Sequence, residues 1–316
     1  MVSLPDWAQH AWLNRLQSLL LLAVMFGIVL AVGVLLFGPD GAWGLVLGLA
    51  LVLVFNPRIS PRWVMRWYRA RPIEPAEAPA LYAALDELCA RAGLPSRPRL
   101  YYLPSRLVNA FAVGHPGNSA IALTDGLLRR LNLRELTAVL AHEVSHIRNN
   151  DLWVMGLADL FGRLTAAMSG FGVMLLFFSL PAVLLGAGLP NPLAVALLIF
   201  SPTLSLLAQL GLSRVREYHA DLNAVWLTRD PLALVRALEK IEHAGNALWE
   251  RLLLPGPRLP EPAWLRTHPP TEARIRRILE VARVLPESSP MVDEEPAWRG
   301  GPPPDPPRWR LNGLWY

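Results

Sequence analysis

The chain has 316 residues, of which 53% are hydrophobic and only 17% are charged. This composition excludes a disordered, collagen-like or disulfide-stapled chain, and its apolar excess indicates a membrane protein. The single cysteine, Cys89, can form neither an internal disulfide nor a thiolate metal site, so any metal must be bound by His, Asp or Glu. The formal charge is +5, but the arginines cluster beside apolar runs instead of forming a basic stripe with interleaved aromatics. Nucleic acid is therefore not expected as a partner.

Residues 1–57 are predicted to form a membrane hairpin. Its first arm, Leu16 to Phe37, has the roughly 20 apolar residues that a bilayer span needs. A turn-like Gly-Pro-Asp-Gly sequence at 38–41 follows, and the second arm, Ala42 to Phe55, is so short that it must borrow flanking residues or thin the bilayer. A cleaved signal peptide is the alternative interpretation of the first arm, but its apolar region is too long and no small-residue cleavage site follows it.

Residues 164–213 are predicted to form a second membrane hairpin, because they contain no Asp, Glu, Lys, Arg or His. Gly186 to Pro192 interrupts this run and marks the turn. The two hairpins together predict about four transmembrane helices, with three or two as the alternatives.

Arginines flank both hairpins on one side, whereas the two short turns carry no positive charge. The flanking arginines are Arg58, Arg62, Arg66, Arg69, Arg71, Arg163, Arg214 and Arg216. By the positive-inside rule, the polar segments 58–163 and 214–285 both face the cytoplasm and can form one catalytic domain. The sequence thus predicts a multi-pass protein of a bacterial cell membrane, in contact with the lipid bilayer. A Pro-rich tail, 286–316, is not expected to contribute to a packed core.

The polar segments predict a mainly α fold with a small β-sheet (α+β). An amphipathic helix is expected over Pro79 to Ala92, and short strands are expected where β-branched and aromatic residues lie between Pro, Gly and Asn. Asn132 and Glu135 form a capping box at the start of a helix whose apolar spacing is followed as far as Ile147. The predicted strands are 99–103, 107–113 and 119–124; further helices are predicted over 214–227, continuing the last span, and over 231–250 and 271–284.

The chemistry is concentrated in His142-Glu143-Val144-Ser145-His146 of the capped helix. Two histidines at i and i+4 project from one face and can share one metal ion. Catalytic zinc takes three protein ligands and water, and the intervening Glu143 is then the candidate base. The alternative is a surface helix that carries two histidines by chance.

A third ligand is available directly after the second hairpin. Glu217 and Asp221 share a helix face, so one carboxylate can reach the metal while the other accepts a hydrogen bond from a ligand histidine. His219 points roughly opposite to Glu217 and is interpreted as a polar or packing residue.

The sequence resembles the HtpX-like membrane zinc metalloproteases, which are gluzincins related to the CAAX prenyl endopeptidases. Four blocks carry the resemblance: Val108–Ala112 with Ile121–Leu128, Leu140–Ile147, Ser213–Asp221, and Thr267–Ile275. The resemblance implies one Zn²⁺ per chain bound by His142, His146 and Glu217, with Glu143 as the catalytic acid/base. It also suggests that Arg274 steadies Asp221 or Glu217 and that His268 lies near the substrate oxyanion. The seven-span CAAX enzymes would need more hydrophobic runs than this chain has.

These observations predict a membrane-embedded zinc endopeptidase that cuts peptides or misfolded and damaged membrane proteins on the cytoplasmic side. A CAAX-type processing protease and a non-catalytic membrane scaffold, with structural zinc or none, are the alternatives.

A substrate strand is expected to bind along residues 107–113. There Asn109 and Phe111 point to one side, and Ala110 and Ala112 to the other. Simple core packing of Phe111 is the alternative.

Overall fold

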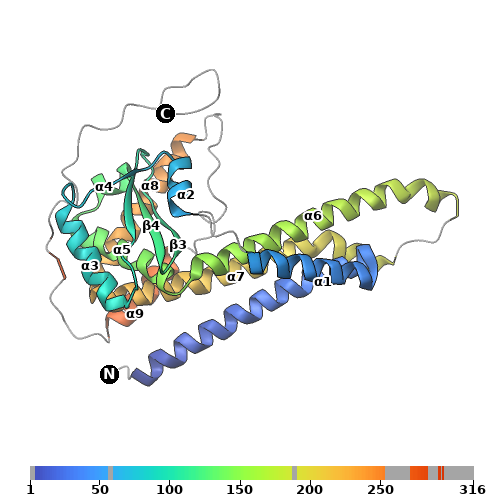
Figure 1. Cartoon of the computed structure of the whole chain (residues 1–316), viewed down its shortest axis with the longest axis horizontal. Helices are drawn as coiled ribbons and strands as arrows, with labels where there is room; N and C mark the ends of the chain where they lie inside the picture. The colour runs from blue at the N-terminus through green and yellow to red at the C-terminus, as the bar shows by residue number, and fades with distance from the viewer. Residues whose placement is uncertain are drawn as a thin grey trace, which may run out of the picture.

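The computed structural model describes residues 4–55, 60–186, 191–252, 271–283, 291–292 and 294. Figure 1 shows a sheet surrounded by helices, from which three long helices extend on one side. We call the part around the sheet the globular half (60–150, 214–252 and 271–283). We call the extending helices the apolar arm: α1 (Leu4–Phe55), α6 (Asp151–Leu184) and residues 192–213 of α7 (Pro192–Thr228). The chain is mainly helical with a small mixed sheet, as the sequence predicts.

The sheet has four strands in the order β1-β2-β4-β3. They are β1 (Arg71–Pro72), β2 (Arg99–Leu103), β3 (Ala110–His115) and β4 (Asn118–Thr124). β2 and β4 are parallel and the other pairs are antiparallel, with Ala110 opposite Leu123 in the β3–β4 pair. In this sheet β3 is an edge strand. The three predicted strands are present, although β3 begins at Ala110 and not at Leu107. The two-residue β1 was not predicted.

The helices of the globular half pack mainly around α5. The predicted helix at 79–92 is α3 (Pro79–Ala92), which ends at Gly93 with φ 64°. Both hydrogen bonds of the predicted capping box start α5 (Leu133–Arg148), and most of its residues are buried. The short helices α2 (Pro61–Trp67) and α4 (Asp125–Arg130) were not predicted. The helices α8 (Pro231–Leu252) and α9 (Thr271–Ala282) were predicted, and their observed ends lie within two residues of the predicted ones.

The core of the globular half lies between α5, the sheet, α3 and α8. Leu136, Leu140 and Val144 of α5 are fully buried there, in one cluster with Leu85 of α3 and Ile121 of β4. Burial of such side chains contributes about 1.5–3 kcal/mol each relative to exposure. The core therefore fixes the face of α5 that carries the two histidines.

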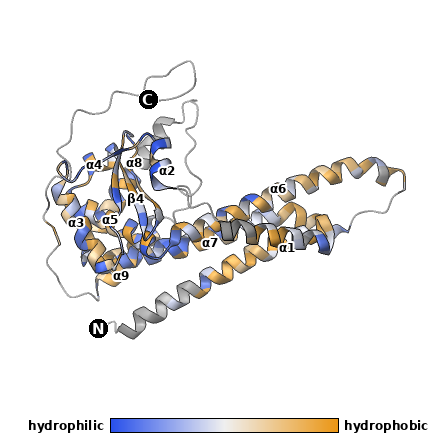
Figure 2. Ribbon diagram, in the orientation of Figure 1, coloured by the Kyte–Doolittle hydropathy of each residue, from blue (hydrophilic) through white to orange (hydrophobic). Residues whose placement is uncertain are grey.

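The apolar arm contains three helices that are long and apolar enough to span a membrane, where about four spans were expected. These candidate spans are Leu16–Gly41, Asp151–Pro181 and Pro192–Thr228. Figure 2 shows hydrophobic residues along all three helices. The last of them continues into the globular half without a break, as predicted.

The expected fourth span, Ala42 to Phe55, is helical but too short. α1 reverses at Gly38, whose φ of 71° is not helical, and Leu45 packs against Gly33, where an added Cβ would lie 2.5 Å from the leucine Cδ1. The expected turn and return of the chain are therefore present. At 1.5 Å per residue the second arm is about 21 Å long, less than the ~30 Å hydrocarbon core. Most of the other expected turn, His268 and all of the Pro-rich tail except residues 291–292 and 294 lie outside the described residues. The expectation that the tail takes no part in a packed core is wrong at Met291 and Val292, which are partly buried against the core of the globular half.

Candidate metal centre

The two histidines of α5 point their Nε2 atoms at one place. His142 is 6% exposed, and its Nε2 lies 3.1 Å from the Nε2 of His146. The i, i+4 spacing brings the rings together on one helix face, where they meet edge to face with centroids 4.6 Å apart. Two buried imidazole nitrogens directed at each other form half of a metal site.

Helix α7 adds the carboxylate of Glu217 to this pair. Its Oε2 lies 3.6 Å from Nε2 of His142, and its Oε1 lies 3.5 Å from Nε2 of His146. The three residues each offer one ligand atom, and these atoms lie within 4.8 Å of one another. Two imidazole nitrogens and one carboxylate oxygen are a donor set that suits zinc. The described residues therefore fit one metal ion held by His142, His146 and Glu217.

The other ring nitrogens face two further carboxylates. Nδ1 of His142 lies 3.0 Å from Oδ1 of Asp221, and Nδ1 of His146 lies 2.9 Å from Oδ2 of Asp151. A carboxylate at Nδ1 fixes the tautomer that leaves Nε2 free for a metal, and it raises the basicity of the imidazole. Asp151 thus orients His146 by a hydrogen bond, and Asp221 lies in close contact with Nδ1 of His142.

Asp151 is a residue that the sequence analysis missed. It follows Asn150, which adopts φ 57° and ψ 30° between α5 and α6 and turns the chain back toward His146. Asn tolerates this left-handed conformation better than most residues. Asp151 is 1% exposed, and its Oδ1 accepts a hydrogen bond of 2.6 Å from Arg216 of α7. The sequence did show an Asp five residues after the second histidine. It did not show the turn at Asn150 that brings this Asp into contact with His146.

Arg274 of α9 lies behind the carboxylates. Its Nε and Nη2 donate to the two oxygens of Asp221 at 2.7 and 2.6 Å, and its Nη1 lies 3.2 Å from Oε2 of Glu217. Arg274 is 6% exposed; burial opposes its charge, but Asp221, Glu217 and Glu143 raise its pKa above the ordinary value. The buried carboxylates are therefore compensated by a fixed cation.

The electrostatics also favour a proton on His146 when no metal competes for it. Burial lowers the pKa of His146, but hydrogen bonds and charges from Asp151 and Glu217 outweigh that effect and raise it well above the ordinary value. Metal binding must then displace a proton, which makes metal affinity depend on pH.

Glu143 lies next to His142 in the chain, and the predicted substrate strand packs against the helix that carries both. Glu143 follows His142 on α5 and is 9% exposed. The sheet edge β3 packs against α5, with Ala112 buried in the main core and Phe111 buried on the opposite face against Tyr68, ring centroids 5.4 Å apart. The backbone of Asn109 bonds to Thr124. Ala110 and Ala112 thus share the face toward α5, and Phe111 has the core position that was the alternative interpretation.

His219 does not join the metal-site group formed by the described residues. Its Nδ1 lies 3.3 Å from the side-chain nitrogen of Asn149, in agreement with its interpretation as a polar packing residue.

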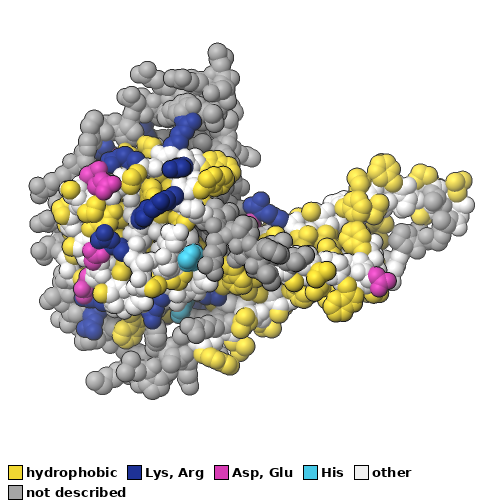
Figure 3. All heavy atoms as spheres, viewed as in Figure 1, with side chains coloured by type: hydrophobic (Ala, Val, Ile, Leu, Met, Phe, Trp, Pro, Cys, Tyr) yellow, Lys and Arg dark blue, Asp and Glu magenta, His cyan; other side chains and the backbone are white. Residues whose placement is uncertain are grey.

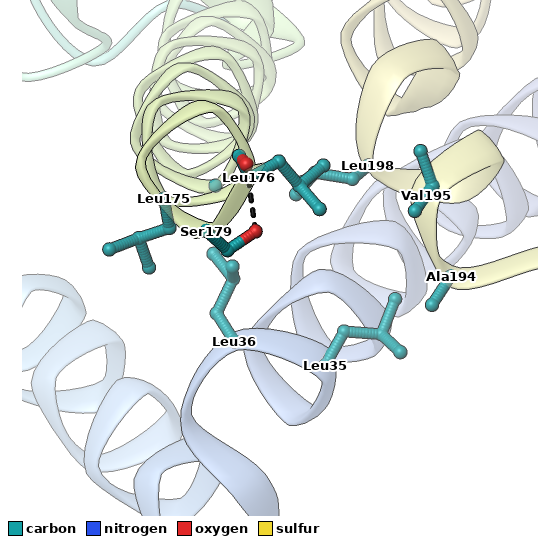
Figure 4. A pocket seen from close by; sticks show the side chains of 9 residues that line it. Leu35, Leu36, Leu175, Leu176, Ser179, Ala194, Val195 and Leu198 are labelled. Carbon is teal, nitrogen blue, oxygen red and sulfur yellow. Dashed lines mark hydrogen bonds between the residues drawn. The ribbon is translucent and has the colours of Figure 1, made fainter. Parts of the chain in front are cut away.

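A second hollow, in the apolar arm, has no such chemistry. It encloses about 280 Å³ between α1, α6 and α7, and Figure 4 shows mostly leucine and other aliphatic side chains around it. Its one hydroxyl, on Ser179, donates to the carbonyl of Leu176 at 2.8 Å. None of the described residues that line this hollow is titratable, so the cluster in the globular half is the candidate active site.

Two histidines one helical turn apart, a carboxylate from a second helix and a glutamate beside the first histidine define a metallopeptidase of the His-Glu-x-x-His class. The comparisons with known proteins give the family. The sequence profile of Peptidase family M48 matches residues 75–282. A protease HtpX homolog of Thermococcus sibiricus is 35% identical over 84% of this chain and 96% of its own length. A protease HtpX homolog of Acaryochloris marina is 35% identical over 86% and 96%.

The chain belongs to peptidase family M48 and to its HtpX homologs, and it is a metallopeptidase. Similar HtpX homologs come from archaea and bacteria alike. The crystal structure of S. mikatae Ste24p covers 85% of this chain and 66% of its own, with 21% identity and a TM-score of 0.45, a likeness too weak to add to that assignment.

Proposed function

We propose that this protein is a membrane-embedded zinc endopeptidase that cuts membrane proteins, above all misfolded or damaged ones, on the cytoplasmic side. The observation that carries the proposal is the position of Glu217. It lies on the unbroken helix Pro192–Thr228, which is itself a candidate span, four residues after the uncharged run that ends at Ser213. The metal centre is therefore held close to the end of the span, within reach of neighbouring membrane proteins.

The reaction assigned to this site is hydrolysis of a peptide bond. His142, His146 and Glu217 would hold zinc, which would supply Lewis acidity to polarise a carbonyl and acidify water. Glu143 accepts a proton from the attacking water and returns it to the nitrogen of the leaving amine. Asp221 and Asp151 keep the two imidazoles in place, and Arg274 holds Asp221 and Glu217 in register. His268 stays a candidate for a position near the substrate oxyanion.

The edge strand β3 is proposed to bind the substrate backbone. Asn109 accepts a hydrogen bond from the backbone of Thr124, and every second residue of an antiparallel strand bonds to the same neighbour. The backbone N–H and C=O groups of Phe111 and Val113 therefore point toward β4, whereas those of Ala110 and Ala112 point away from it. An extended peptide can pair with these groups. Such pairing recognises backbone more than side chains, so broad specificity is expected.

The cytoplasmic orientation is supported by the distribution of arginine. Arg163 precedes the uncharged part of α6, Arg216 follows the uncharged part of α7, and Arg62, Arg66 and Arg69 follow α1. The positive-inside rule places these flanks, and with them the globular half, in the cytoplasm.

Substitution of Glu143 tests the proposal. In Glu143→Gln the metal ligands stay intact, so the purified protein should keep one zinc per chain while its proteolysis of casein and of membrane substrates falls about 10²–10⁴-fold. Glu87→Gln, an exposed change on α3, is the matched control and should retain wild-type activity. Zinc retention combined with wild-type proteolysis in Glu143→Gln would rule out the mechanism.

The same variant identifies the substrates. Glu143→Gln, expressed in membranes, should retain uncleaved substrates that can be captured and sequenced. Diverse membrane proteins with cytoplasmic cleavage sites support quality control. A single class of prenylated C-termini would instead support CAAX-type processing, and a protein with neither zinc nor activity would be a scaffold.

A further inference from the structure

The short helix α2 has two chemically different faces. Pro61 and Met65 are buried, whereas Trp63 and Trp67 are 56% and 76% exposed. The two tryptophans lie at i, i+4 with ring centroids 5.4 Å apart, so they form one exposed aromatic surface. Two adjacent tryptophans with so much exposed ring surface are unusual on a face that contacts only water.

The buried face of α2 is packed firmly on the sheet. Met65 is fully buried in one cluster with Phe111 of β3 and Ala122 of β4. At the end of β3, a Cβ added to Gly114 would lie 2.8 Å from Cγ of Pro61, so the two elements are in close contact. α2 therefore cannot turn its tryptophans inward without breaking this core, and its position fixes that of β3.

The exposed face of α2 is also basic. Arg62 and Arg66 are exposed at i, i+4 beside the tryptophans, and Arg69 is exposed just after the helix. No Asp or Glu occurs in the sequence between Asp40 and Glu74. Figure 3 shows basic and hydrophobic side chains next to each other on the face of the globular half that carries α2. Tryptophan beside arginine is the combination that binds the headgroup layer of a membrane with anionic lipids.

The location of α2 agrees with such a partner. Residues 56–59 are all that separates α1 from Ser60, the residue that precedes α2. Figure 1 places α2 on the side of the globular half from which the apolar arm extends. The aromatic and basic surface therefore follows the first span closely in the chain and lies on the arm's side of the globular half.

We propose that Trp63 and Trp67, with Arg62, Arg66 and Arg69, form an interfacial anchor that binds anionic lipid headgroups and holds the edge strand β3 at the membrane surface. The inference rests on the membrane location and extends the proposed function, because an anchored β3 meets substrate segments as they leave the bilayer. It identifies the lipid interface, and not a second protein, as the occupant of this surface.

Depth measurements on the reconstituted full-length protein test the anchor. Trp63→Cys and Trp67→Cys are each made in a Cys89→Ala background, labelled with a nitroxide and reconstituted in vesicles of phosphatidylglycerol and phosphatidylcholine. Both labels should be more accessible to oxygen, which concentrates in lipid, than to a water-soluble nickel chelate. The matched control is Ala83→Cys, an exposed residue of α3, which packs on the opposite face of the sheet from α2; its label should show the reverse order.

The arginines have their own signature. Raising the phosphatidylglycerol fraction should deepen the labels at positions 63 and 67, and the double change Arg62→Gln with Arg66→Gln should remove that dependence. The depth of a label is measured without any proteolysis, so the test of the anchor does not depend on whether the proposed enzymatic function is correct. Labels at 63 and 67 that prefer the nickel chelate, as at 83, would overturn the anchor. Labels shielded from both reagents would also overturn it, because a second copy of the chain would then cover this face.

Discussion

The two halves of the molecule reverse the placement of apolar and polar side chains. In the globular half, most of the large fully buried residues are leucines and isoleucines such as Leu136 and Ile121. In the apolar arm, Phe177, Phe178 and Leu184 are 67%, 69% and 86% exposed. The same residue types thus face outward in one half and inward in the other. The difference shows that each half is adapted to its own solvent, water for one and lipid for the other.

Buried polar groups differ in the same way. The arm buries hydroxyls that bond to the backbone, as when Ser169 of α6 donates to the carbonyl of Leu198 of α7 at 2.6 Å. The globular half buries full charges, including Glu217, Asp221 and Arg274, and compensates them by pairing. Helix α7 carries both kinds of environment, so the metal centre lies where they meet.

Removing the central cation should have the largest effect on stability, since it tests whether buried charges in the globular half depend on pairing. In Arg274→Met the carboxylates of Asp221 and Glu217 lose a buried partner, which should reduce the free energy of unfolding by about 3–5 kcal/mol. The matched control is Arg276→Met, an exposed change on the same helix, which should stay within about 0.5 kcal/mol. Both are measured as thermal unfolding of the purified proteins. Equal melting temperatures would mean that the network is not required for the fold.

A charge placed on each surface tests the comparison directly. Leu175 of α6 is 44% exposed and Leu279 of α9 is 38% exposed, so Leu→Lys at each position adds the same charge at similar exposure. Leu175 lies six residues before the end of its candidate span at Pro181, where lysine costs at most the about 3 kcal/mol that it costs at the centre of a span; on a water-facing surface the change should be within about 0.5 kcal/mol. Melting in lipid nanodiscs and the fraction of chains in the membrane should fall for Leu175→Lys only. Equal losses at both positions would mean that the arm is not in lipid.

Much of the globular half is predictable because its signals are local. The capping box of Asn132 and Glu135 places the start of α5, and the spacing of His142 and His146 on that helix already defines half of a metal site. α2 and α4 were missed because helices of seven and six residues are too short to show a hydrophobic period. The reversal of α1 at Gly38 was predicted correctly. The fourth span predicted after it was wrong, because the second arm of α1 is too short to cross a bilayer.

Residues that act through tertiary contacts were harder to predict. Asp221 was expected near a histidine because it shares a helix face with Glu217. Asp151 was missed because its contact with His146 depends on the left-handed conformation of Asn150. Arg274 was pointed out by family resemblance, since no local pattern connects α9 with α7. Spacing along one helix can thus be read from sequence, whereas contacts between helices cannot.

The pair Asp151–Arg216 joins the first turn of α6 to α7, so Asp151→Asn tests how the two halves share the metal centre. Loss of the carboxylate charge at Nδ1 of His146 should weaken zinc binding about 10–100-fold, measured by competition with a chelator. Asp159→Asn is the matched control on the same helix, since Asp159 makes only an exposed i, i+4 pair with Arg163. If the two variants bound zinc equally tightly, the contact with Asp151 would have no influence on the metal.

The pH dependence of zinc binding gives a second reading of the same contact. Asp151 and Glu217 raise the pKa of His146, and a protonated imidazole cannot bind zinc. Affinity should therefore fall about tenfold per pH unit once the pH drops below that raised pKa. Asp151→Asn removes one cause of the raised pKa, so the fall should begin at a lower pH than in the wild type. A fall that begins at the same pH in both proteins would contradict this assignment.

The smallest effect is expected where the globular half meets its substrate. In Ala112→Pro the lost backbone donor is one that points away from β4, so the sheet should survive, as proline is tolerated on edge strands. We expect KM for a peptide to rise several-fold, about 1 kcal/mol for one hydrogen bond, with zinc content unchanged.

A peptide N-methylated at the pairing amide supplies the matching change in the substrate. If both changes remove the same hydrogen bond, the methyl group should weaken binding to the wild type and have little further effect on Ala112→Pro. Additive losses would mean that proline at 112 acts through the shape of β3 and that the substrate pairs elsewhere.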